Sequence, residues 1–182
     1  MTFSKFQATQ IVVSGSRDRS IVTWDLLQGS KLNCQKEAHS RLITSVKIYE
    51  DQIFSSSRDR SIKVWDLLSL SPIQTLTGPH TIFYHNHSVW SIDICENYLI
   101  SASADQTLGV WKKEENDWHF QHKLNNEEAV RNVIILKKSP NLALSGDLIG
   151  DLKVNTKKKS HTYQSISRNF VFPLFIGLEF AQ

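Results

Sequence analysis

Three aspartates stand at matching places in short polar segments, and their carboxylates are the groups in this sequence that most resemble catalytic acids. They are Asp18, Asp59 and Asp105, each followed two residues later by Ser or Thr. Acid–base catalysis needs a second carboxylate, a base or a nucleophile held nearby, and no such group recurs beside these three. Aspartate in a polar turn commonly accepts hydrogen bonds from the backbone just after it. We therefore expect these side chains to stabilise turns, and we expect no enzymatic activity.

A histidine cluster has the side chains to bind a metal ion. His80, His85 and His87 lie close together in the sequence, and imidazole is a common zinc ligand. Closed zinc sites use four ligands, often including cysteine, but neither Cys34 nor Cys95 is near this cluster in sequence. We expect histidines of a loop here, with no metal and no cofactor.

Arginines surround the first two aspartates and open a later apolar segment. The set is Arg17, Arg19, Arg58, Arg60 and Arg131. A guanidinium group forms paired hydrogen bonds with phosphate or carboxylate, so these arginines are candidates for binding an acidic or phosphorylated peptide. The alternative is a solvated surface on which they pair with neighbouring acids or water, as exposed charges commonly do. The third aspartate has Ala104 and Gln106 in the matching places, which limits the basic surface to the first two segments.

The aspartates and arginines belong to a repeated segment. Residues 14–27 recur at 55–68, shifted by 41 residues with eleven of fourteen positions identical, and weaker copies run over 101–111 and 145–155. A period of this length indicates an array of structural repeats. In each copy a small-residue strand leads into a polar turn, after which apolar and polar residues alternate. Each copy is therefore predicted to be a β-hairpin with the aspartate in its turn.

The tryptophans at the ends of the hairpins give the array a family resemblance. Trp24 and Trp65 are followed by Asp and Trp111 by Lys, which resembles the eponymous dipeptide of WD-repeat β-propellers, whose four-stranded blades are about forty residues long. The resemblance covers roughly residues 10–155 and implies an all-β partial propeller. The segments expected are blade 1 at about 1–36, blade 2 at 37–77, blade 3 at 84–124, a degenerate blade 4 at 126–155, and an unassigned tail at 156–182.

The resemblance also implies a polar network in each blade. The family has a histidine before the innermost strand, a position that His39 and His85 occupy here. Such a histidine can bond to the turn aspartate and to a strand hydroxyl, which also accepts from the indole N–H. The predicted structural sets are His39, Asp59 and Trp65 in blade 2, His85, Asp105 and Trp111 in blade 3, and Asp18 and Trp24 in blade 1. Blade 4 has Asn126, Ile149 and Asn155 at these positions, so we expect it to lack the network and to be the least rigid.

Four blades are fewer than most WD-repeat rings contain. Either the chain is part of a longer protein or something else completes the ring, and open edges are expected to promote self-association. The third repeat begins five residues late, which predicts a loop insertion between Leu76 and Tyr84. The apolar segment 170–178 is either a strand on the exposed side of blade 4 or a tail unrelated to the array, and it is too short to span a membrane.

The function that the resemblance implies is protein binding, by a rigid scaffold that recognises partner peptides through its upper-face loops. In F-box/WD-repeat substrate receptors of ubiquitin ligases, arginines before the turn aspartate, after it and early in the inner strand hold phosphorylated degrons. The five arginines of this chain occupy such positions, although the 182 residues include no F-box. The alternative is a general assembly scaffold, for RNA processing or trafficking, without preference for phosphate.

The composition fits a folded β protein and argues against nucleic-acid and membrane partners. Hydrophobic residues make up 40% and aromatic residues 10% of the chain, and the net charge of +3 is too small to indicate nucleic acid. Two cysteines suit a reducing compartment better than a disulfide framework. No apolar run is long enough to cross a bilayer, and residues 1–10 lack the apolar core of a signal peptide. We therefore expect a cytoplasmic or nuclear protein with no membrane partner.

Overall fold

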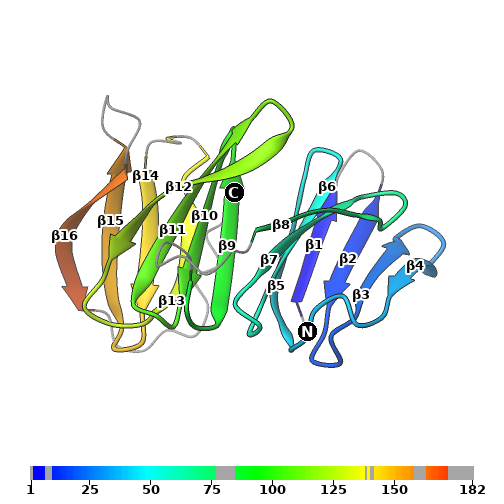
Figure 1. Cartoon of the computed structure of the whole chain (residues 1–182), viewed down its shortest axis with the longest axis horizontal. Coiled ribbons are helices and arrows are strands. Elements are labelled where there is room, and N and C mark those ends of the chain that lie inside the picture. The colour runs from blue at the N-terminus through cyan, green and yellow to red at the C-terminus, as the bar shows by residue number, and fades with distance from the viewer. Residues whose placement is uncertain are drawn as a thin grey trace.

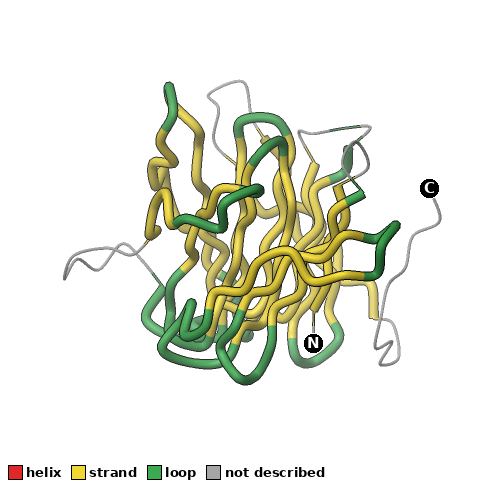
Figure 2. The backbone as a smooth tube through the Cα atoms, turned by 90° about the vertical axis from the view of Figure 1, so that its right-hand side faces the viewer, coloured by secondary structure: helices red, strands yellow, loops and turns green. Residues whose placement is uncertain are grey.

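The structure is a computed structural model, and it describes residues 2–6, 10–76, 85–137, 139, 142–157 and 163–171. The regular structure in these ranges consists of β-strands joined by loops and turns (Figure 2). No helix in the described ranges is long and apolar enough to cross a membrane. The predicted loop insertion between Leu76 and Tyr84 and the last residues, 172–182, lie outside them.

The strands form four antiparallel sheets, each with four strands in chain order. Blade 1 contains β1 (Thr2–Phe6), β2 (Ile11–Gly15), β3 (Ile21–Asp25) and β4 (Ser30–Gln35). Blade 2 contains β5 (Ile43–Tyr49), β6 (Gln52–Ser57), β7 (Ile62–Asp66) and β8 (Pro72–Leu76). Blade 3 contains β9 (Val89–Cys95), β10 (Tyr98–Ser103), β11 (Thr107–Glu114) and β12 (Asp117–Asn125). Blade 4 contains β13 (Val130–Ile135), β14 (Leu142–Asp147), β15 (Asp151–Lys157) and β16 (Tyr163–Val171).

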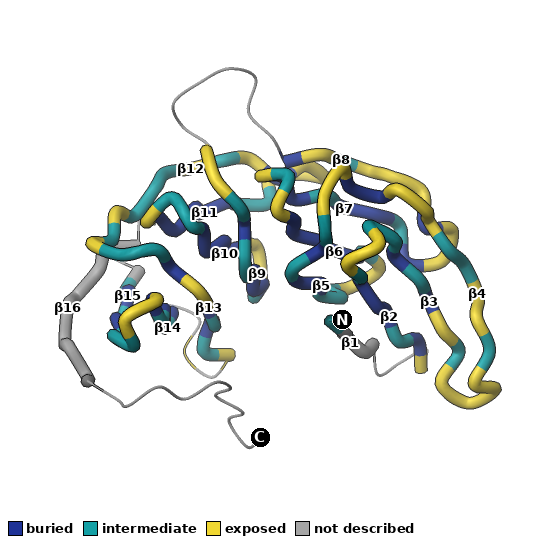
Figure 3. The backbone as a smooth tube through the Cα atoms, turned by 90° about the horizontal axis from the view of Figure 1, so that it is seen from below, coloured by how far each residue is buried: buried dark blue, intermediate teal, exposed yellow. Residues whose placement is uncertain are grey.

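The four sheets stand side by side in an open arc, as the blades of a propeller do (Figures 1 and 3). The first strand of each sheet lies on the inner side of the arc, where β5 contacts both β1 and β9, and β9 contacts β13. The last strands β4, β8 and β12 lie on the outer side (Figure 3), and β16 is likewise the last strand in the order of its sheet. The predicted all-β fold of propeller-like blades is therefore confirmed. The fourth sheet continues beyond residue 155, because β16 pairs with β15.

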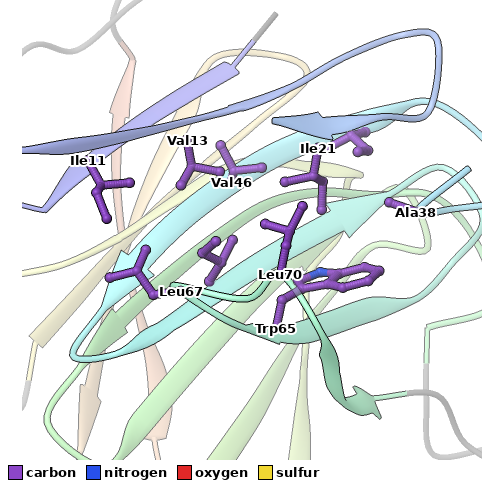
Figure 4. Close-up of a cluster of buried hydrophobic side chains, with 10 residues drawn as sticks. Ile11, Val13, Ile21, Ala38, Val46, Trp65, Leu67 and Leu70 are labelled. Atoms are coloured by element: carbon purple, nitrogen blue, oxygen red, sulfur yellow. The ribbon is translucent and has the colours of Figure 1, made fainter. Parts of the chain in front are cut away.

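Alternating side chains give each blade two apolar faces. We call the face toward the preceding blade the leading face and the face toward the following blade the trailing face. The trailing face of blade 1, with Ile11, Val13 and Ile21, packs on the leading face of blade 2, which includes Val46 and Trp65 (Figure 4). Two further clusters fill the next two interfaces in the same way. The hydrophobic core is thus divided into layers between blades, and each layer is completed by two neighbours.

Three innermost strands carry a β-bulge at the same position. The pairing with the second strand skips the second residue of β5, β9 and β13, which is Thr44, Trp90 and Arg131 respectively. A bulge leaves one residue without a cross-strand partner and redirects its side chain. All three bulges occur where the innermost strand begins, beside the hairpin turn that carries the aspartate.

Candidate functional site

The hairpin turns with the aspartates gather at one end of the sheets, together with the loops that enter the innermost strands. Backbone hydrogen bonds join the turns of blades 2, 3 and 4 to these loops: Arg58 donates to Leu42, Ala104 to Ser88 and Leu148 to Ala129, at 3.0–3.1 Å. We call this end the turn face. It consists of the turns at 16–20, 57–61, 103–107 and 147–151 and the loops that enter β5, β9 and β13.

The aspartate fixes the shape of each turn by accepting from the residue two positions later. Asp59 Oδ1 accepts from the backbone N–H of Ser61 at 3.0 Å and from its hydroxyl at 2.6 Å. The residue between them takes a positive φ, 75° at Arg60, 74° at Arg19 and 64° at Gln106. Such a conformation lets a short loop reverse between twisted strands. The side chain after the aspartate is therefore held in the same way on the turns of blades 1, 2 and 3.

In blade 2 a buried polar network connects the turn to the middle of the sheet. The Nδ1 atom of His39 lies 2.9 Å from Asp59 Oδ2, and its Nε2 atom lies 2.8 Å from the hydroxyl of Ser55. The indole N–H of Trp65 donates to the same hydroxyl at 2.8 Å. Because an ionised carboxylate only accepts, the ring proton of His39 is placed on Nδ1, toward Asp59. One chain of hydrogen bonds therefore joins the loop, the turn and two strands.

The same network is present in blade 3 and reduced in blade 1. His85 contacts Asp105 at 3.1 Å and the Ser101 hydroxyl at 2.7 Å, and Trp111 donates to that hydroxyl at 3.1 Å. Blade 1 has only the two ends of the network. Asp18 accepts from Ser20 at 2.9 Å, and Trp24 donates to Ser14 at 2.9 Å, with no histidine between them.

The order Asp59, His39, Ser55 resembles a nucleophilic triad in composition and distances, but its burial argues against nucleophilic chemistry. Ser55 is 0% exposed and His39 is 1% exposed, so no substrate reaches the hydroxyl. The oxygen of Ser55 already accepts from Trp65. A nucleophile needs a free lone pair and room for the reacting carbon. The geometry therefore stabilises the register of the sheet and supports a structural interpretation.

Blade 4 corrects one expectation, because part of its network is present in altered form. The side-chain amide of Asn155, which replaces the tryptophan, donates to the Ser145 hydroxyl at 3.0 Å and is buried. Asp147, two residues before the predicted slot at Ile149, accepts from the backbone N–H of Ile149 and of Asp151. An amide N–H can reach the hydroxyl as an indole N–H does, so the hydrogen bond survives the change of side chain.

The turn face is basic over the first two blades. Arg17, Arg58 and Arg60 are exposed, and none of the three has an ion-pair partner among the described residues. Arg41 is also exposed there, in the loop that enters β5. No repeat pattern points to Arg41, because the sequence of that loop differs between repeats. Arg19 differs, since it pairs with Glu37 at 3.0 Å. The opposite end of this face is acidic, with Glu127 and Glu128 in the loop before β13.

Arg131 lies apart from the turn arginines and against an aromatic ring. Its guanidinium carbon is 4.9 Å from the ring centroid of Trp90, and Arg131 is exposed. Both are the bulged residues of adjacent innermost strands. The bulge is what brings a side chain of β9 and one of β13 together at the inner edge of the turn face.

The described residues contain no group of three or more His, Cys, Asp or Glu side chains placed to hold a metal ion. Of the candidate histidine cluster, His85 is engaged with Asp105 and Ser101, and His80 lies outside the described ranges. Both ring nitrogens of His85 are therefore engaged in the polar network of blade 3.

The pKa values of the buried aspartates are strongly perturbed. Burial alone would raise the pKa of Asp59, but hydrogen bonds from His39 and Ser61 and the charge of His39 outweigh it and hold the pKa well below its usual range. Burial would also raise the pKa of Asp105, but the hydrogen bond and charge of His85 and the hydrogen bond from Thr107 outweigh it. The pKa of Asp105 is therefore also well below its usual range.

We expect these two carboxylates to make the protein acid-sensitive. An unfolded aspartate titrates near pH 3.9, roughly, whereas the folded one stays ionised to lower pH. As the pH falls below about 5 the unfolded chain takes up protons that the folded chain does not, so stability is lost. Urea unfolding at pH 7 and pH 3 should show a smaller drop for the D59N/D105N variant than for the wild type. The exposed Asp51→Asn serves as the control, and equal drops in all three would contradict the expectation.

Comparison with known proteins gives a family for part of the chain and a fold for most of it. The sequence profile of the WD domain, G-beta repeat, matches residues 31–66 and 71–112, less than half of the chain. Each match starts in or just before the last strand of one sheet and ends in the third strand of the next. No curated protein matches the sequence.

Two solved structures of designed proteins resemble the fold. The computationally designed Ika4 protein has 23% identity and a TM-score of 0.70, over 84% of this chain and 88% of its own. The computationally designed Ika8 protein has 22% identity and a TM-score of 0.71, over 86% of this chain but only 45% of its own, so this chain spans less than half of the Ika8 chain. At such identities the likeness concerns the fold alone.

Proposed function

We infer that this chain, which carries WD40 repeats in four sheets that resemble propeller blades, is a protein-binding scaffold whose turn face holds the partner. Repeats of this family generally serve as scaffolds for protein interaction and are typically not catalytic. The turn face suits recognition because rigid strands support its loops, and buried networks fix the turns of blades 2 and 3.

The finer proposal is that the turn face binds an acidic or phosphorylated segment of the partner. The observation that carries it is the set of exposed arginines over blades 1 and 2, three of which lack a carboxylate partner among the described side chains. Guanidinium groups bind phosphate bidentately. Arg131 extends the basic surface toward blade 4. Glu127 and Glu128 repel phosphate there, which favours blades 1 and 2 as its place.

The most specific version is a substrate receptor of a ubiquitin ligase, which would present a phosphorylated degron to the ligase. It rests on the arginines before and after the turn aspartate and early in the inner strand. Both cysteines are free thiols, which supports a cytoplasmic or nuclear location. The second candidate, an assembly scaffold without phosphate preference, would instead use the aromatic surface at Trp90.

Reversal of one charge on the turn face is expected to weaken binding of a phosphopeptide at least about tenfold, since a charge-assisted hydrogen bond contributes about 1.5–3 kcal/mol. Fluorescence anisotropy with a phosphopeptide library would compare the wild type with Arg58→Glu. Lys31→Glu makes the same charge change on β4, away from the turn face, and should leave binding unchanged. Unchanged binding by Arg58→Glu would refute the phosphate proposal. Binding that survives removal of the phosphate would favour the general scaffold.

A further inference from the structure

The tryptophan of blade 1 is exposed where its counterparts are buried. Trp65 and Trp111 are 3% and 2% exposed, whereas Trp24 is 37% exposed. All three occupy the same register position and donate to the equivalent serine. The difference arises because Trp65 and Trp111 lie on leading faces that the blade before them covers, whereas no described blade covers the leading face of blade 1. Val12, next to Trp24 across the strand pair, is likewise only half-buried.

The trailing face of blade 4 is also not covered by a described blade. In blade 3 this face consists of Tyr98, Ile100, Leu108 and Val110, all at most 6% exposed because they pack on blade 4. The register places Leu142, Leu144, Leu152 and Val154 at the same positions of blade 4. They alternate along their strands with buried residues, and each of the four is only partly buried. Blade 4 thus offers an apolar trailing face that no further described blade covers.

We propose that two copies of this chain associate head to tail, the trailing face of blade 4 of each covering the leading face of blade 1 of the other, to form a closed ring of eight blades. The two uncovered faces are the leading face of blade 1 and the trailing face of blade 4. At each of the three interfaces between consecutive blades, a trailing face packs on a leading face in the same way. A second copy supplies both partners at once, and the pair therefore has two identical interfaces.

The shape of the chain agrees with this arrangement. The described blades form an open arc with the innermost strands on its concave side (Figure 3). The Ika8 structure matches this chain over 45% of its length with a TM-score of 0.71. Because the matched part is less than half of the Ika8 chain, that chain is long enough to contain a second arc of this size. Closure would also place both turn faces on the same side of the ring, doubling the basic surface of the proposed function.

The test measures the mass of the 182-residue chain in solution and disrupts each face separately. Light scattering coupled to size-exclusion chromatography should give twice the chain mass of 20.9 kDa for the wild type. Trp24→Arg places a charge on the leading face of blade 1, and Leu144→Glu places one on the trailing face of blade 4. Each variant alone damages both interfaces of the pair and should shift to the mass of one chain. Leu68→Arg, at a position 68% exposed in a turn away from both faces, should keep the double mass.

A mixture of the Trp24→Arg and Leu144→Glu variants tests whether the two faces bind each other. In a mixed pair one interface is fully wild-type and the other opposes Arg with Glu, so the double mass should return on mixing. A wild-type chain that remains a single copy at tens of micromolar would overturn the proposal. So would variants that keep the double mass, a mixture that stays monomeric, or masses that keep growing with concentration, since an open head-to-tail array grows without limit. The mass does not depend on phosphopeptide binding, so this test and that of the proposed function fail independently.

Discussion

Replacement of His39 by alanine is expected to lower the free energy of unfolding by about 3 kcal/mol, because it leaves the largely buried Asp59 carboxylate and the buried Ser55 hydroxyl each short of one hydrogen-bond partner. Asp59 would lose its 2.9 Å contact with the ring, and the Ser55 hydroxyl would lose one at 2.8 Å. Urea unfolding monitored by tryptophan fluorescence at pH 7 would measure the change. His85→Ala should behave alike, because Asp105 and Ser101 surround it in the same way.

The matched control for His39 lies two residues earlier in the same loop. Glu37 forms an exposed ion pair with Arg19, and its side chain is 74% exposed. Exposed pairs contribute about 0–1 kcal/mol, so Glu37→Ala should change stability little. If the two variants lost the same stability, the network would not be what holds blade 2 to the loop before it.

Replacement of Phe54 by alanine is expected to cost about 3–5 kcal/mol, the range for a buried phenylalanine. Phe54 is 0% exposed in the layer between blades 2 and 3, where its ring meets the edge of Trp118 at a centroid distance of 5.3 Å. The cavity would weaken the contact between two blades as well as the sheet itself. Thermal and urea unfolding would measure the loss.

The control for Phe54 is Ile73→Ala on the outer strand of the same blade, at a position 47% exposed. We expect a change of about 0.5 kcal/mol or less there. A Phe54 variant with near wild-type stability would mean that the layer between blades 2 and 3 contributes little to folding, which would contradict the layered core.

The sequence predicted those features that depend on residues of the same type recurring at matching positions of the repeats. His39, Asp59 and Trp65 recur at matching intervals as His85, Asp105 and Trp111, and a hydrogen-bonded network is present at both places. The alternation into Trp65 and Trp111 likewise indicated strands with one set of side chains on each face, and strands are present there. These features are local, so a repeat unit carries the information for them.

Other features were not predictable because they depend on neighbours or on geometry that the repeat pattern does not contain. Asn155 keeps the bond to Ser145 although it does not resemble tryptophan. Trp24 is exposed because its side chain lies on a face that no described blade covers. The strand β16 carries no motif and is specified by its pairing with β15. The bulge at Arg131 is a register shift that leaves no sequence pattern.

The three bulges have a consequence for the evolution of binding specificity. Thr44, Trp90 and Arg131 differ in size and charge, yet the pairing with the second strand skips each of them in the same way. Thr44 is held by hydrogen bonds to Ser56 and to the carbonyl of Val89, whereas Arg131 is exposed and can be exchanged at little thermodynamic cost. Substitution of Arg131 can therefore change the ligand that this edge of the turn face prefers while folding is left intact. A combinatorial library restricted to codon 131 would sample new specificities with few misfolded members.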